Sequence, residues 1–141
     1  MNKKQIILAA MMLVAATNFS FTQSFFPTLG KLSPVQIERI DKNYAAALAS
    51  GNNGIVESAL AIITMIKLDQ PAIELPLLRT KIEYLASYSR TPSIRYKACL
   101  ANGVLADPAM FKQVSARQYN DPDEFFSAID GKSDQTSLSL K

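Results

Sequence analysis

The chain has 141 residues, a formal net charge of +3, one cysteine and no histidine. Without histidine, and with a single cysteine, it lacks the parts for a zinc site, a Ser-His or Cys-His nucleophile system or an internal disulfide. The small charge does not indicate nucleic-acid binding. We therefore expect no enzyme, no metal and no cofactor. The only cysteine, Cys99, stands between Ala98 and Leu100, and we expect it to be a small buried apolar residue.

The first residues have the pattern of an export signal. Lys3 and Lys4 precede an unbroken apolar run, Ile6 to Ala16, which ends in small residues typical of a cleavage site. The run is shorter than the roughly 20 residues of a spanning helix. We predict a signal peptide over residues 1–22 and export, to the periplasm if the source is Gram-negative and otherwise by secretion. An uncleaved anchor is the alternative, and only then would the chain contact a membrane.

We predict an extended leader over residues 23–32, a helical domain over residues 33–130 and a disordered tail over residues 131–141. The first helix has a clear start, because Ser33 is an N-cap, Pro34 follows at the first helical position and Gln36 completes a capping box. Gly51 predicts a left-handed stop. Phe25 and Phe26 of the leader are candidates to pack against the domain.

A second apolar run, Ile55 to Leu68, poses the question of a membrane helix or a core helix. As a helix it is about 21 Å long, against roughly 30 Å of bilayer hydrocarbon. Glu57, Thr64 and Lys67 share one narrow strip of the helical wheel. The broad opposite side is apolar and includes Ile55, Val56, Ala59, Leu60, Ile62, Ile63 and Ile66. The pattern predicts a central core helix that contacts several neighbours.

Proline-marked helix starts follow this run at Pro76, Pro92, Pro108 and Pro122. Pro76 must stand in the first turn of a third helix, since an interior proline costs about 3 kcal/mol, so this helix starts between Ala72 and Pro76. Thr91 and Pro92 begin a fourth helix, which has one apolar face of Ile94, Ala98, Ala101 and Leu105. Asp121 and Pro122 begin a last helix, which we expect to end at Gly131. We assign the acidic residues Asp121, Asp123 and Glu124 to this helix start rather than to acid-base chemistry.

The second and fourth helices match at an offset of 39 residues. Ile55 aligns with Ile94, Ala59 with Ala98, Ile62 with Ala101 and Ile66 with Leu105. The stretch "TPSIRYKACLANGVLADP" resembles the second helix of a HEAT repeat, and "NNGIVESALAIITMIKL" is similar to a weaker copy. The resemblance covers about residues 33–108. It implies an all-α fold of antiparallel helix hairpins stacked as a short HEAT-like α-solenoid, with short C-terminal capping helices that carry Phe111, Phe125 and Phe126.

The HEAT resemblance implies a non-enzymatic scaffold that binds another envelope or extracellular protein. The second helices of such repeats line the concave surface, and here they supply the candidate binding residues Glu57, Thr64, Lys67, Arg95, Tyr96 and Asn102. The alternative function is a small carrier that holds an apolar or lipid ligand between its helices. A second candidate surface combines Arg79, Lys81, Tyr84, Tyr88, Arg95 and Tyr96, but we expect Tyr84 and Tyr88 to be half-buried packing residues.

Overall fold

The computed structural model describes residues 25–26 and 29–139, with residues 133–139 as backbone only. The predicted signal peptide lies outside these residues. All regular elements of the described chain are helices, which confirms the all-α fold class. The elements are α2 (Pro34–Leu48), α3 (Asn53–Asp69), α4 (Pro76–Tyr88), α5 (Pro92–Ala106), the 3-10 helix η2 (Pro108–Phe111), α6 (Lys112–Ser115) and α7 (Pro122–Ser139).

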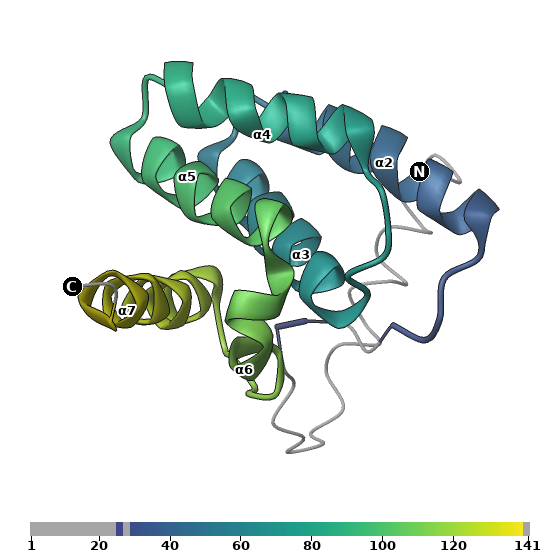
Figure 1. Ribbon diagram of the computed structural model, residues 1–141. Coiled ribbons are helices and arrows are strands. Elements are labelled where there is room, and N and C mark those ends of the chain that lie inside the picture. Colours follow the sequence, from purple (N-terminus) through teal and green to yellow (C-terminus); the bar gives the residue numbers. More distant parts are fainter. Residues whose placement is uncertain (1–24, 27–28, 140–141) are drawn as a thin grey trace, which may run out of the picture.

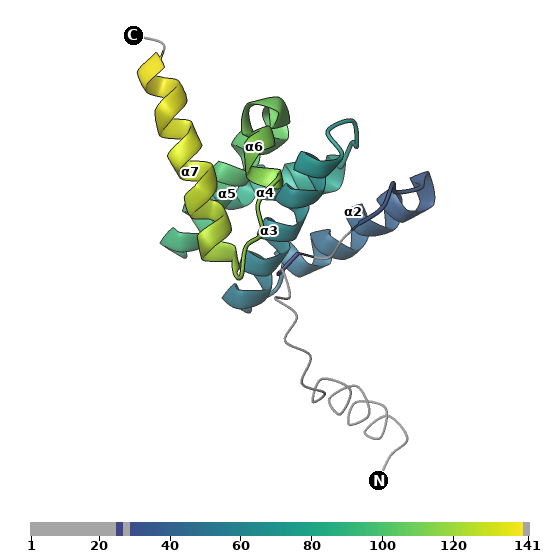
Figure 2. The ribbon, with the colours of Figure 1, turned by 90° about the horizontal axis from the view of Figure 1, so that it is seen from below.

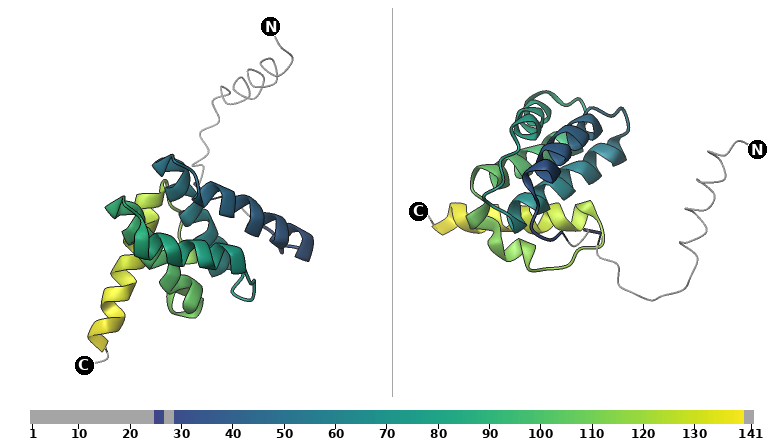
Figure 3. Two further views of the ribbon diagram at one scale, coloured as in Figure 1. Left: turned by 90° about the horizontal axis from the view of Figure 1, so that it is seen from above. Right: turned by 90° about the vertical axis from the view of Figure 1, so that its right-hand side faces the viewer.

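The helices form three layers (Figure 1). The pairs α2/α3 and α4/α5 lie side by side, so that α2 packs against α4 and α3 packs against α5. The third layer consists of η2, α6 and α7, which pack against α3 and α5 on the side away from α2 and α4. Figure 3 shows α7 running beneath α4 and α5 in its right-hand view. The C-terminal end of α7 extends beyond the rest of the domain (Figure 2).

The predicted helix starts follow local chemistry. The Ser33 hydroxyl accepts from the Gln36 amide at 3.3 Å, and the Gln36 side chain accepts from the Ser33 amide at 2.9 Å, which confirms the capping box. Asn52 caps α3 through the amide of Ile55 at 3.3 Å. Pro76 and Pro92 occupy the first position of α4 and α5. A proline at this position costs the helix no hydrogen bond, because the first amide of a helix has no intrahelical partner.

The apolar run forms the central helix, as predicted. Helix α3 packs against α2, α5, η2, α6 and α7, and its Leu60, Ala61 and Ile63 are fully buried. Within the described residues, no helix is both long and apolar enough to cross a membrane. The prediction is wrong for one residue of the core face, Ile55, whose side chain is 47% exposed.

The C-terminal layer is fixed by aromatic side chains. Phe111, Phe125 and Phe126, predicted to lie on the C-terminal capping helices, are buried in the core. The leader joins them, since Phe26 packs edge-to-face on Tyr119 and Phe125 with ring centroids 6.2 and 4.8 Å away. The amide of Phe25 also donates to the Tyr119 carbonyl at 2.9 Å. The leader therefore ties the start of the domain to its end.

Two predicted glycine stops are wrong. Neither Gly51 nor Gly131 adopts a positive φ, and α2 already ends at Leu48 with Ala49 as its C-cap. Helix α7 continues through Gly131 to Ser139, so the predicted disordered tail is a helix up to that residue. An interior glycine costs a helix only about 1 kcal/mol, and the buried first half of α7 provides packing that outweighs this cost.

Candidate functional site

Two of the six residues predicted to form a binding face on the second helices, Thr64 and Lys67, are buried. Thr64 is fully buried, and its hydroxyl donates to the Leu60 carbonyl at 2.6 Å. Lys67 is buried too, and its ammonium donates to the Ile73 carbonyl at 2.6 Å. Of the six candidate residues, these two therefore do not present their side chains to a partner. The strip of α3 that carries Glu57 and Lys67 contacts α5 and the segment between α3 and α4, through Lys97 and Ile73.

The other four predicted residues do not form one surface. Glu57 is half-buried and accepts a hydrogen bond from the Ser93 hydroxyl at 3.0 Å. Asn102 is half-buried, whereas Arg95 and Tyr96 are exposed on α5. The Arg95 guanidinium donates to the Ser89 carbonyl at 2.9 Å, where it neutralises the negative end of α4. The structure thus gives Glu57 and Arg95 packing partners of their own.

The tyrosines of α4 are more exposed than expected. Tyr84 is 61% and Tyr88 is 69% exposed, and their ring centroids lie 5.2 Å apart. The prediction that they are half-buried is wrong. Cys99 is also exposed, with its sulfur 3.7 Å from the Ala86 carbonyl oxygen, so the expected burial of this thiol is wrong as well.

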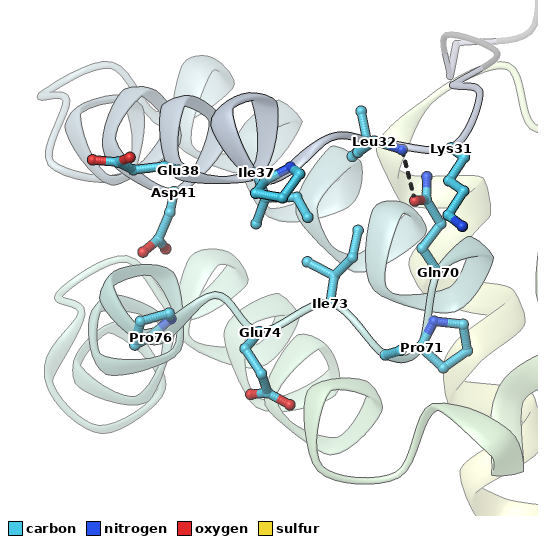
Figure 4. Close-up of a pocket in the computed structure, with 12 residues that line it drawn as sticks. Lys31, Leu32, Ile37, Glu38, Asp41, Gln70, Pro71, Ile73, Glu74 and Pro76 are labelled. Carbon is cyan, nitrogen blue, oxygen red and sulfur yellow. Dashed lines mark hydrogen bonds between the residues drawn. The ribbon is translucent and has the colours of Figure 1, made fainter.

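A groove of about 750 Å³ lies between the start of α2 and the segment that joins α3 to α4. Ile37 and Ile73 point towards each other across it (Figure 4). The lining is predominantly apolar and comprises Lys31, Leu32, Pro34, Ile37, Glu38, Asp41, Gln70, Pro71, Ala72, Ile73, Glu74 and Pro76. None of the twelve was among the residues predicted to form a binding surface. The signal that could have found them is the proline pair Pro71 and Pro76, which marks a rigid extended segment.

Gln70 holds the two walls of this groove together. Its side-chain oxygen accepts from the Leu32 amide at 3.1 Å, and its side-chain amide donates to the Gly30 carbonyl at 3.1 Å. The first of these bonds is visible in Figure 4. The opposite wall is anchored from beneath by Lys67, which binds the Ile73 carbonyl. Both walls are therefore fixed before any ligand arrives, which lowers the entropic cost of binding.

Asp41 closes one end of the groove. This buried residue of α2 accepts hydrogen bonds from the amides of Leu77 and Leu78, at 3.2 and 2.9 Å. It supplies from another helix the cap that α4 lacks, because the N-cap residue Leu75 has no side-chain acceptor. Its negative charge also interacts favourably with the positive N-terminal end of the α4 dipole. Both carboxylate oxygens of Asp41 are therefore used to cap α4.

The rim of the groove carries the remaining charges. Lys31, Glu38 and Glu74 are exposed. Glu38 pairs with Lys42 at 2.7 Å, and this hydrogen bond and charge lower the pKa of the Glu38 carboxyl. The arrangement of an apolar bed, a fixed backbone and a charged rim suits binding. The lining residues include no histidine, cysteine or serine that could act as a nucleophile.

A buried cation, which the sequence did not reveal, joins three helices. Lys97 of α5 is 8% exposed and pairs with Glu57 of α3 at 3.3 Å and with Asp123 of α7. Burial lowers the pKa of Lys97, but the hydrogen bonds and charges of Asp123 and Glu57 outweigh it, so this pKa lies above its ordinary value. Glu57 lies 40 residues before Lys97 in the sequence, and Asp123 lies 26 residues after it, so no short motif could reveal the cluster. The two ion pairs hold α7 of the C-terminal layer against α3 and α5.

Within the described part of the chain, no group of three or more acidic, cysteine or histidine side chains is placed to hold a metal ion. Comparisons with protein-family models, curated proteins and solved structures each find no match for this chain.

Proposed function

We propose that the chain is an exported, non-enzymatic helical module, built from two HEAT-like helix pairs, that binds another envelope or extracellular protein. The groove beside α2 takes an apolar segment of that partner, flanked by basic residues. The single observation that carries the proposal is the groove itself, an apolar surface of about 750 Å³ with both walls fixed by hydrogen bonds.

The shape of the groove supports a chain segment as its occupant. It is open to solvent, whereas small-ligand sites bury most of their ligand in a cleft or cavity. Ile37 and Ile73 offer contacts for one or two apolar anchors, which carry most of the energy in protein recognition. The main chain of the partner can stay in water along the open side.

The rim charges support basic flanks on the partner. Glu38 and Glu74 stand on the rim, together with one cation, Lys31. Exposed ion pairs contribute little affinity, about 0–1 kcal/mol each. Their effect is on selectivity and on the rate of encounter. We therefore assign affinity to the apolar floor and partner choice to Glu74, because Glu38 is already paired with Lys42.

The apolar lining also suits the second candidate function, a carrier of an apolar or lipid ligand. The space near Phe26, Ile62 and Met65 holds only about 10 Å³, too little for a lipid chain. A lipid in the groove beside Asp41 would meet the carboxylate of Glu74 on the rim, which repels an anionic head group. Native mass spectrometry of the gently purified protein distinguishes the two functions, because a carrier keeps a lipid mass and a protein-binding module does not.

Export is tested by the N-terminus of the product. Expressed from the full sequence in a bacterial host and fractionated, the protein should appear outside the cytoplasm, with its first residue near position 23 by intact-mass measurement. A full-length mass in the cytoplasmic fraction would contradict export. A full-length mass in the membrane fraction would favour the uncleaved anchor.

The groove is tested by selecting peptides from a random display library on the purified protein. We expect enrichment of peptides with one or two large apolar residues beside Lys or Arg. These peptides should bind Ile37→Ala and Glu74→Lys at least about tenfold more weakly, a loss of about 1.4 kcal/mol. Matched controls are Val35→Ala, an exposed residue of the same helix outside the groove, and Glu83→Lys, on the exposed side of α4.

Three results would contradict the proposed site. Selected peptides with acidic flanks would show that Glu74 does not choose the partner. Equal binding to all four variants would place the binding surface elsewhere. Loss of binding in the double variant Arg95→Ala, Tyr96→Ala would show that the binding surface lies on the exposed side of α5.

A further inference from the structure

A second groove, of about 550 Å³, lies on the free edge of the first helix pair. It is lined by Tyr44, Ala47, Asn52, Gly54, Ile55, Ser58, Ala59 and Ile62, and shares no residue with the groove beside Asp41. The lining includes no charged side chain. Ile55, on its surface, is among the most exposed large apolar residues of the described chain.

The second helix pair indicates what covers such an edge. Helices α3 and α5 begin 39 residues apart, at Asn53 and Pro92, which is the offset of the sequence match. In α5, Ser93 and Lys97 contact Glu57 of α3, at 3.0 and 3.3 Å. The positions equivalent to Ser93 and Lys97 are Gly54 and Ser58, and both line the edge groove. The side of α5 that packs on α3 therefore corresponds to the side of α3 that is open.

The burial of residues at equivalent positions of α5 and α3 also shows that this side is covered in α5 and open in α3. Ile94 of α5 is 4% exposed and Ala101 is fully buried, whereas Ile55 is 47% exposed and Ile62 is half-buried. In the second pair this side is covered by an α3 helix. We propose that in solution it is covered by the α3 helix of a second copy, in a two-fold symmetric dimer.

The composition of the groove selects a second copy with two-fold symmetry. Around a two-fold axis each residue near the axis meets its own counterpart, so a charged lining would repel itself. The lining has no charge, and Gly54, Ser58 and Ala59 leave room for two helices to approach closely. Ile55 lies three residues before Ser58 and Ile62 four residues after it, about one helical turn to either side, so each isoleucine of one copy can pack near the other isoleucine of its partner.

A head-to-tail stack of copies is disfavoured. It would place exposed residues of α4 and α5 on the edge groove, and the exposed residues of these two helices include Lys81, Glu83 and Arg95. Burying these charges against an uncharged groove costs free energy without a compensating partner. The two-fold arrangement also closes, whereas head-to-tail stacking continues into a filament.

The test is a charge swap at Ser58 in the mature chain. By sedimentation velocity the native protein should dimerise with rising concentration. Ser58→Glu and Ser58→Lys should each weaken the dimer at least about tenfold, because like charges meet across the axis. An equal mixture of the two variants should restore a dimer that contains one copy of each, seen by native mass spectrometry. Thr80→Glu, at an exposed site of α4, is the control and should dimerise normally.

A disulfide trap tests the axis independently. Ser58→Cys in a Cys99→Ser background should form a disulfide-linked dimer under mild oxidation, since two copies of residue 58 meet. A native protein that stays monomeric at every concentration overturns the proposal. So does a dimer that survives Ser58→Glu, or a variant mixture that stays monomeric. A monomer that binds a foreign amphipathic helix at Ile55 assigns the groove to a different partner and likewise overturns it.

Discussion

The two helix pairs have related sequences but different surroundings. Ile94 of the second pair is 4% exposed, and its counterpart Ile55 in the first pair is 47% exposed. Both occupy the same position in the 39-residue offset and both are isoleucine. The difference lies entirely in the neighbour, because α5 packs against α3, and the described chain contains no helix that covers α3 in the same way. Residue pattern predicts which side of a helix is apolar, and topology decides whether that side is covered.

The pairs also differ in how their helices begin. Helix α3 is capped by the adjacent Asn52, whereas α4 is capped from a distance by Asp41 of the first pair. The N-cap residue of α5, Thr91, makes no side-chain hydrogen bond to the helix. A local cap stabilises one helix, but the cap from Asp41 stabilises the packing of one pair on the other. The second pair thus takes the cap of its first helix from the first pair.

The largest expected effect is on the two aligned isoleucines. Ile94→Ala should lower the free energy of unfolding by about 2–4 kcal/mol, because it opens a cavity in a packed core. Ile55→Ala should change it by less than about 0.5 kcal/mol in the monomer, because a surface side chain loses little. Urea denaturation at low protein concentration measures both. Equal losses would mean that the two positions have the same cover, which would remove the basis of the comparison.

Much of this comparison could be predicted from local sequence. The Ser33 capping box, the proline starts at Pro76 and Pro92 and the buried face around Ala98 are encoded by nearby residues, and all are present. The exposure of Ile55 and the burial of Thr64 could not be predicted, since each depends on which distant element packs there. The groove beside Asp41 was missed for the same reason. Its walls meet only when Gln70 contacts Leu32, 38 residues away.

The next effect concerns Lys97, whose counterpart in the first pair is the uncharged Ser58. Lys97→Met leaves Glu57 half-buried without its ion pair. Breaking a fully buried pair costs about 3–5 kcal/mol. Here Asp123 is 81% exposed and its charge is well hydrated, so we expect about 1–2 kcal/mol. Ser58→Ala should cost less than about 0.5 kcal/mol by the same denaturation assay. A neutral Lys97→Met would show that the ion pairs do not hold the C-terminal layer.

The stabilisation by Lys97 should also depend on pH in a defined direction. The Lys97 pKa lies above its ordinary value of 10.5 in the folded protein. A raised lysine pKa stabilises the fold below the unfolded value, and this stability is lost as the pH rises through the folded pKa. The difference in unfolding free energy between the native protein and Lys97→Met should be constant from pH 7 to 9 and should shrink above pH 10.5. Growth of the difference in alkali would contradict the assignment.

A smaller effect is expected at the two unlike caps. Asp41→Ala removes the acceptor for two amides of α4 and should lower the unfolding free energy by about 1 kcal/mol. Thr91→Ala removes no cap hydrogen bond and should have almost no effect. Asp41→Asn keeps an acceptor but loses the charge at the helix start, so its loss should lie between the two. Hydrogen exchange at Leu78 provides a local readout, since its amide loses protection only if Asp41 is the cap.

The smallest perturbation compares Cys99 with its counterpart Leu60. Cys99 is exposed, whereas Leu60 is fully buried against the central layers. A thiol reagent should therefore modify the native protein at Cys99 without denaturant, and the unfolding free energy should not change. Leu60→Cys in a Cys99→Ser background should react only as fast as the protein unfolds, because a buried thiol is reached through global opening. Slow reaction at Cys99 would mean that a second surface covers α5, and the two pairs would then differ less than their burial indicates.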